Sequence, residues 1–92
     1  MKVLISPGFG FGWSTWNYVD LAFDPDIINA FELGLDEDSM CAFIRTLGYD
    51  EPNMGGYHQC KIVDIPKGTR FRIKEYDGHE YIDYDDDFLT AI

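Results

Sequence analysis

The sequence predicts an α+β domain in which two short helices pack on one face of a small, mainly antiparallel sheet, in the order β-α-α-β-β-β. Three observations support this prediction: an apolar run near the start, two capped segments with helical spacing of apolar residues, and a C-terminal Asp-Gly hairpin signal. We expect residues 1–92 to form a single domain, because the chain is short and no Pro/Ser-rich linker divides it.

Local signals predict the first strand and both helices. The run KVLIS at residues 2–6 is nearly continuously apolar and ends at a Pro-Gly pair, which suits an inner strand. Residues 24–34 have Asp24 as a helix N-cap, proline at the first helical position and a terminal glycine. Residues 36–48 begin with acids that suit the positive end of a helix dipole. This second helix has a stripe of residues expected to face the core: Met40, Phe43, Ile44 and Leu47.

The C-terminal part of the chain predicts three strands and two turns. CKIVDI and TRFRIKEY flank the turn PKG, and Asp77-Gly78 leads into HEYIDY. A two-residue turn fixes the register of the hairpin. Counting outward from it gives the pairs Tyr76–His79, Glu75–Glu80, Lys74–Tyr81, Ile73–Ile82, Arg72–Asp83, Phe71–Tyr84 and Arg70–Asp85.

The two faces of this hairpin have different characters. The outer face forms the cross-strand ion pairs Arg72–Asp83 and Arg70–Asp85. The inner face, which we expect to pack on the helices, collects Phe71, Ile73, Ile82 and Tyr84.

Glu75 and Glu80 fall opposite each other on the apolar face, where like charges are unfavourable. One interpretation is that the hairpin tip overhangs the core and both carboxylates are hydrated. The other is that the pair lines a cleft and is shared with a cationic or hydroxyl-bearing ligand.

The charge of the chain excludes several partners. Seventeen acidic against seven basic residues give a net charge of −10, which argues against binding to nucleic acid or to an acidic membrane surface. The acids serve solubility, or they form a face that engages a basic host surface. Neither a bilayer-spanning stretch nor a signal peptide is visible, so we expect a soluble, cytoplasmic protein.

The cysteines predict neither a disulfide framework nor a metal site. Cys41 and Cys60 are the only thiols and have no C-x-x-C spacing. With His58 and His79 they would supply four zinc ligands, but the spacings match none of the usual zinc patterns.

The segment SPGFGFGWSTWN, residues 6–17, is named here the aromatic-glycine loop. Its glycines do not form G-x-G-x-x-G, because Trp13 occupies the place of the last glycine. Ser14 is not part of a nucleophile elbow, because Trp16 replaces the second glycine of G-x-S-x-G. With no triad or nucleotide motif in the chain, we predict no catalytic residue and no cofactor.

Glycines that let a ligand approach the backbone, rings that stack and hydroxyls that donate hydrogen bonds are the components of a small-molecule pocket. A flat heteroaromatic ligand such as a nucleobase suits them. The alternative is that the rings cap one end of the sheet and belong to the core. The candidate ligand-binding residues are Phe9, Phe11, Trp13, Ser14, Trp16, Asn17, Glu75 and Glu80.

The stretches KVLISPGFGFGWSTWN and IPKGTRFRIKEYDGHEYI, about a third of the chain, resemble the signature stretches of small, acidic, functionally uncharacterised proteins of tailed bacteriophages. The resemblance implies an accessory protein, made in an infected bacterium, of the kind that counters host defence. We therefore expect a non-enzymatic protein that binds or sequesters a small ligand, such as a nucleotide-derived signalling molecule, through the aromatic-glycine loop. The alternative is an acidic protein that binds and inhibits a host defence or nucleic-acid-processing protein. The strand edges and the aromatic residues are also compatible with a homodimer.

Overall fold

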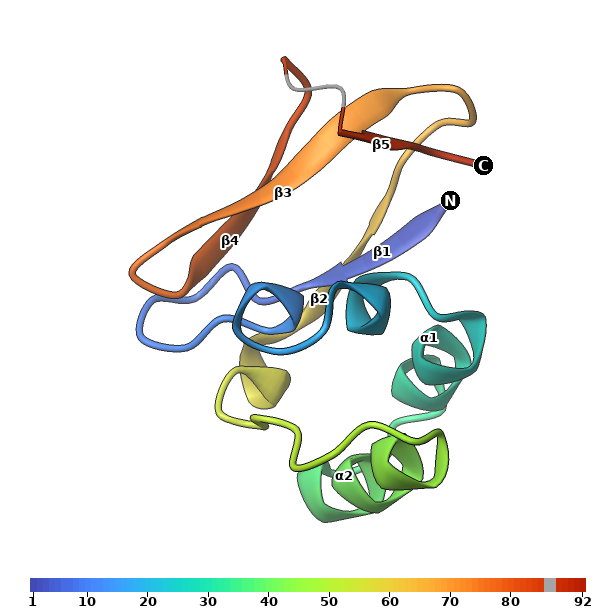
Figure 1. The fold of residues 1–92 in the computed structure, drawn as a ribbon, viewed down its shortest axis with the longest axis vertical. Coiled ribbons are helices and arrows are strands. Elements are labelled where there is room, and N and C mark those ends of the chain that lie inside the picture. Colours follow the sequence, from blue (N-terminus) through green and yellow to red (C-terminus); the bar gives the residue numbers. More distant parts are fainter. Residues whose placement is uncertain (86–87) are drawn as a thin grey trace.

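The helices and strands follow the predicted order. The computed structural model describes residues 1–85 and 88–92 (Figure 1). Two helices combined with antiparallel sheets confirm the α+β class. The elements are β1 (Lys2–Ile5), α1 (Pro25–Glu32), α2 (Glu37–Thr46), β2 (Lys61–Asp64), β3 (Arg70–Tyr76), β4 (His79–Asp83) and β5 (Leu89–Thr90). The sequence pattern did not predict β5 or the short 3-10 helices at Ser14–Trp16, Val19–Ala22 and Tyr57–Gln59.

The described strands divide between two antiparallel sheets, with the orders β1-β2 and β4-β3-β5. In Figure 1 the β1-β2 sheet lies between the three-stranded sheet and the two helices. Strand β1 is buried on both faces, as predicted for an inner strand. Val3 and Ile5 pack in a sheet core with residues of β3 and β5, whereas Leu4 packs in a helical core with residues of α1 and α2. Successive side chains of a strand point to opposite faces, so this short strand serves both cores.

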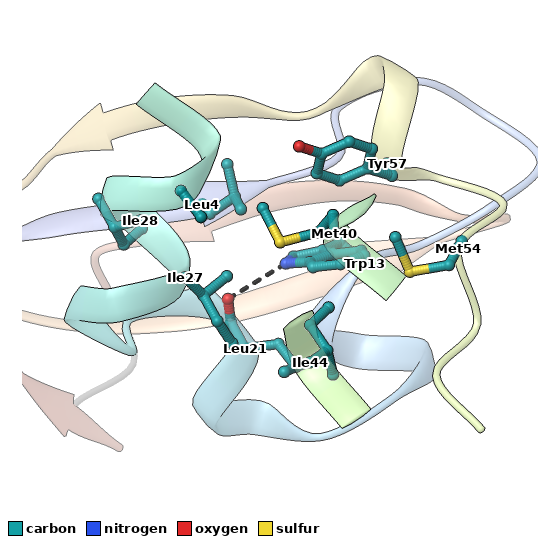
Figure 2. Close-up of a cluster of buried hydrophobic side chains, with 10 residues drawn as sticks. Leu4, Trp13, Leu21, Ile27, Ile28, Met40, Ile44, Met54 and Tyr57 are labelled. Carbon is teal, nitrogen blue, oxygen red and sulfur yellow. Dashed lines mark hydrogen bonds between the residues drawn. The ribbon is translucent and has the colours of Figure 1, made fainter. Parts of the chain in front are cut away.

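Helix α1 begins at its predicted cap Asp24, and helix α2 begins at Asp36, the first of the acids predicted to open it. The Asp24 carboxylate accepts hydrogen bonds from the backbone N–H groups of Asp26 and Ile27, and the Asp36 carboxylate accepts one from that of Ser39. These contacts satisfy amide groups that have no partner within the helix. The helical core contains the buried residues Leu4, Trp13, Leu21, Ile27, Ile28, Ala30, Met40, Ile44, Met54 and Tyr57 (Figure 2).

The apolar stripe predicted for α2 is buried at two of its four positions. Met40 and Ile44 are fully buried, and Phe43 is partly buried. Leu47 was expected to face the core, but 37% of its surface is exposed. Helix α2 ends at Thr46, so Leu47 is the C-cap residue and lies outside the regular stripe.

The β3–β4 hairpin has the predicted register over the five pairs nearest the turn. Asp77 and Gly78 both have positive φ, 49° and 81°, as a two-residue hairpin turn requires. Ile73 and Ile82 lie opposite each other and pack against the sheet core, as predicted.

The prediction is wrong for the two pairs farthest from the turn, Phe71–Tyr84 and Arg70–Asp85. Strand β4 ends at Asp83, whose carboxylate accepts a hydrogen bond of 2.9 Å from the Asp85 N–H group at the start of a turn. Tyr84 is therefore exposed and does not join the apolar face. Phe71 pairs instead with Leu89 of β5.

Candidate functional site

The aromatic-glycine loop leaves β1 and passes directly against the tip of the β3–β4 hairpin (Figure 1). The Gly10 N–H group donates a 2.7 Å hydrogen bond to the carbonyl of Asp77. A Cβ atom at Gly78 would lie 2.4 Å from the backbone nitrogen of Phe11. The loop and the turn therefore form one backbone unit in which a side chain at Gly78 has no room.

Glu80 joins this unit from inside. Its side chain is fully buried, and its Oε1 accepts a 2.8 Å hydrogen bond from the Ser6 N–H group. Oε2 accepts three hydrogen bonds, from the Trp13 N–H at 2.8 Å, the Thr15 N–H at 2.9 Å and the Thr15 hydroxyl at 2.5 Å. The expectation of a hydrated Glu80 is wrong, because the loop folds over β4 and replaces water with its own donors. The same contacts leave Glu80 unavailable as a ligand-binding group.

Trp13 is a core residue. Its ring is fully buried, its Nε1–H donates to the carbonyl of Leu21 at 3.2 Å, and its centroid lies 5.6 Å from that of Tyr57 (Figure 2). Ser14 is also buried, in the 3-10 turn that follows. The prediction that Trp13 stacks on a ligand is therefore wrong, and the core alternative holds for this ring.

Phe9 lies on the outer side of the hairpin. Its ring stacks on His79 at a centroid distance of 4.9 Å, and His79 stacks in turn on Tyr81 at 5.7 Å. The His79 Nδ1 atom contacts the carbonyl of Pro7, which fixes the middle ring. Tyr76 is the register partner of His79 and shares its face of the hairpin. We name the four residues Phe9, Tyr76, His79 and Tyr81 the outer aromatic face.

Phe11 and Trp16 form a second exposed group, the loop pair. Their ring centroids lie 5.8 Å apart in an edge-to-face arrangement. Trp16 Nε1–H donates to Glu75 Oε2 at 3.3 Å, and the same oxygen accepts a 2.9 Å hydrogen bond from the Gly78 N–H group. Glu75 is thus exposed and joins the loop to the turn, while Glu80 is buried beneath it. The two opposed carboxylates have separate partners.

Asn17 closes the other end of the loop. Its side-chain amide donates to the carbonyls of Trp13 and Asn53, at 2.9 and 2.8 Å. Its side-chain oxygen accepts from the Asn53 N–H group at 2.5 Å. These bonds attach the loop to the segment before the 3-10 helix Tyr57–Gln59, so Asn17 has a structural role.

Among the described residues, one hollow lies beside the chain termini and another beside the aromatic-glycine loop. A pocket of about 410 Å³ lies at the chain termini and is mainly apolar, lined by Met1, Lys2, Phe23, Pro25, Ile28, Asn29, Glu32 and Ile92. A loop-side pocket of about 270 Å³ is lined by Ser14, Thr15, Asn17, Val19, Arg72, Ile73, Phe88 and Leu89. Of the predicted ligand-binding residues, only Ser14 and Asn17 line either pocket.

The outer face of the hairpin also contains charged side chains. Lys74 Nζ lies 2.7 Å from Asp83 Oδ2, one step diagonal to the predicted Arg72–Asp83 pair. The hydrogen bond from Lys74, followed by that from the Asp85 backbone, holds the pKa of Asp83 below its usual value. The Arg72 guanidinium lies 4.3 Å from the centroid of the Phe88 ring.

The described residues offer little reactive chemistry. Burial, with a further contribution from the nearby charge of Glu80, raises the pKa of the Cys60 thiol, so this thiol is a poor nucleophile at neutral pH. Within residues 1–85 and 88–92, no three side chains among His, Cys, Asp and Glu are grouped to hold a metal ion. Over the same ranges, neither helix has the length and apolar character needed to cross a membrane.

Sequence reasoning missed the roles of Thr15, Tyr76, His79 and Tyr81. The predicted register already placed Tyr76, His79 and Tyr81 on one face of the hairpin. This shared face could have indicated an aromatic surface. Nothing in the local sequence of Thr15 indicates its contact with Glu80.

The fold and these surfaces define a small acidic α+β domain with exposed aromatic rings at a hairpin tip. Comparisons with protein families, curated proteins and solved structures find no match for the chain.

Proposed function

We propose that this protein is a non-enzymatic interaction domain that docks a partner protein on its outer aromatic face. The observation that carries the proposal is the exposure of rings that are nevertheless fixed in position. Phe9 is 63% exposed and Tyr76 is 73% exposed, yet Phe9 stacks on a histidine held by the Pro7 carbonyl. Exposed apolar patches mark interaction sites, and aromatic residues supply much of the binding energy at interfaces.

The charge of the chain indicates the chemistry of the partner. With a net charge of −10, the domain attracts basic surfaces and repels acidic ones. Glu75 and Asp77 are exposed at the tip of the same hairpin. Lys74, the register partner of Tyr81, is paired with Asp83. The partner we propose has an apolar contact site surrounded by Lys and Arg. This deepens the expectation of an acidic protein that occupies the basic site of a host defence or nucleic-acid-processing protein.

Peptide selection tests this proposal with the protein alone. A displayed random peptide library is selected on the intact protein, and a selected sequence is synthesised as the probe. We expect selected peptides to combine aromatic or aliphatic residues with Lys and Arg. Phe9→Ala and Tyr81→Ala should each weaken binding of the probe by tenfold or more, equivalent to about 1.4 kcal/mol, without moving the unfolding midpoint.

Leu33→Ala is the matched control, because Leu33 is 73% exposed and follows α1, outside the outer aromatic face. It should leave binding unchanged. Equal losses in Phe9→Ala and Leu33→Ala, or selection of acidic peptides, would exclude docking on the outer aromatic face.

The loop-side pocket favours a second candidate function, the binding of a small ligand. Ser14, Thr15 and Asn17 are among its polar lining residues, and Ile73 and Phe88 are among its apolar ones. The probe is adenosine monophosphate, titrated into isotope-labelled protein. Binding here predicts amide shifts at Ser14 and Asn17 that disappear in Val19→Phe, which fills the pocket. Absence of shifts in the wild-type protein rejects this nucleotide as a ligand.

A further inference from the structure

The four hydrogen bonds that the Glu80 side chain accepts within the described chain all come from one segment, the aromatic-glycine loop. Three of its partner groups are backbone N–H groups, which can only donate, and the fourth is the Thr15 hydroxyl. A carboxylate offers these groups acceptors alone. We propose that Glu80 is a positioning residue, whose carboxylate holds residues 6–15 in one conformation and so presets the exposed rings for docking. This inference rests on the proposed function.

The sequence alternation of β4 connects the buried carboxylate to the surface. Glu80 points inward between His79 and Tyr81, whose rings point outward in the stack with Phe9. The Glu80 N–H group donates a 2.8 Å hydrogen bond to the Ser6 carbonyl, while Oε1 accepts from the Ser6 N–H. One strand therefore fixes both the start of the loop and two rings of the outer aromatic face.

The same carboxylate orders the loop pair. The N–H groups of Trp13 and Thr15 both converge on Oε2, which brings the chain into the 3-10 turn that contains Trp16. Phe11, two residues before Trp13, contacts Trp16 across this turn. Preset rings bind with less loss of conformational freedom than rings on a mobile loop.

Glutamine cannot replace Glu80. If its NH₂ group takes the place of Oε2, it meets the backbone N–H donors of Trp13 and Thr15. If the side chain is flipped, the NH₂ group meets the Ser6 N–H. Either orientation leaves buried donors facing each other, although the size of the side chain is unchanged.

The test compares Glu80→Gln with Ile65→Val, a conservative substitution at a buried residue of the sheet core. Amide hydrogen exchange and acrylamide quenching of Trp16 are measured on the full chain, and neither needs a partner. We expect the Trp13 and Thr15 amides to exchange at least tenfold faster in Glu80→Gln than in Ile65→Val. Quenching of Trp16 should rise, and the selected peptide should bind at least tenfold more weakly.

A second pair of variants decides the matter if Glu80→Gln does not fold. Thr15→Ser retains the hydroxyl donor and should behave as wild type, whereas Thr15→Val loses it and should loosen the loop. Unchanged exchange in Glu80→Gln, or equal behaviour of the two Thr15 variants, would overturn the positioning role. So would a loosened loop that binds the peptide as tightly as wild type. Failure of the wild-type protein to select any peptide would count against the docking function alone, because the exchange measurements still report on the loop.

Discussion

Trp13 and Trp16 lie three residues apart and have opposite environments. Trp13 is fully buried in the helical core, while Trp16 is 40% exposed and lies edge-to-face with Phe11. The aromatic rings of the loop therefore have two different roles. One ring anchors the loop in the core, and the others remain at the surface.

This difference predicts opposite effects of the two alanine substitutions. Trp13→Ala should lower the free energy of unfolding by about 3 to 5 kcal/mol, because it leaves a large cavity, and Trp16→Ala by less than about 1 kcal/mol. Urea unfolding measures both values. In Trp13→Phe only the exposed Trp16 remains, so acrylamide should quench the fluorescence strongly. In Trp16→Phe only the buried Trp13 remains, so quenching should be weak. Equal stability losses would contradict these assignments.

Gly78 provides a second test at the residue scale. Its φ of 81° disfavours any side chain, and a Cβ atom there would also collide with the backbone of Phe11. Gly78→Ala should destabilise the domain by more than about 1 kcal/mol. Gly10→Ala is the control, because Gly10 also has positive φ, 100°, but nothing lies within 4 Å of its Cβ position. If the two variants unfold at the same urea concentration, the close contact between turn and loop is absent.

At the scale of elements, the buried side of α2 is centred on Met40 and Ile44. Ile44→Ala should cost about 2 to 5 kcal/mol of stability, whereas Leu47→Ala should cost less than about 1 kcal/mol because Leu47 is exposed. Thermal unfolding of the two variants measures the difference. A larger loss for Leu47→Ala would show that the helix extends past Thr46 and buries its last turn.

The elements also show how far the sequence could predict this structure. Helix caps and the Asp-Gly turn depend on contacts within about four residues, so they can be recognised from the local sequence. The predictions of both helices and of the hairpin turn are confirmed. The partners of Glu80 lie between 65 and 74 residues away in sequence. No pattern around Glu80 indicates which segment covers it, so its burial could not be predicted. For the same reason the sequence left open whether the Trp13 ring belongs to the core or meets a ligand.

On the scale of the whole molecule, the hairpin tip and the chain termini lie at opposite ends (Figure 1). The outer aromatic face is at the tip, and the apolar pocket of about 410 Å³ is at the termini. The chain as a whole has a net charge of −10. Charge thus steers a basic partner toward the domain, and the exposed rings determine where it binds.

Association with the selected peptide should therefore depend on salt. We expect the association rate to fall by tenfold or more between low ionic strength and about 0.5 M salt, because screening shortens the range of the attraction. The dissociation rate should change much less, because it depends mainly on contacts with the rings. Stopped-flow measurements separate the two rates. An association rate that is independent of salt would contradict electrostatic steering.

The most direct test of docking on the outer aromatic face is a titration of isotope-labelled protein with the selected peptide, followed by the ring resonances of Phe9, His79 and Tyr81. Contact with the rings predicts the largest shift changes at these three residues and at Tyr76, with little change in α1 and α2. Shift changes confined to the helices or to the terminal pocket, with the four rings unaffected, would contradict docking at the hairpin tip.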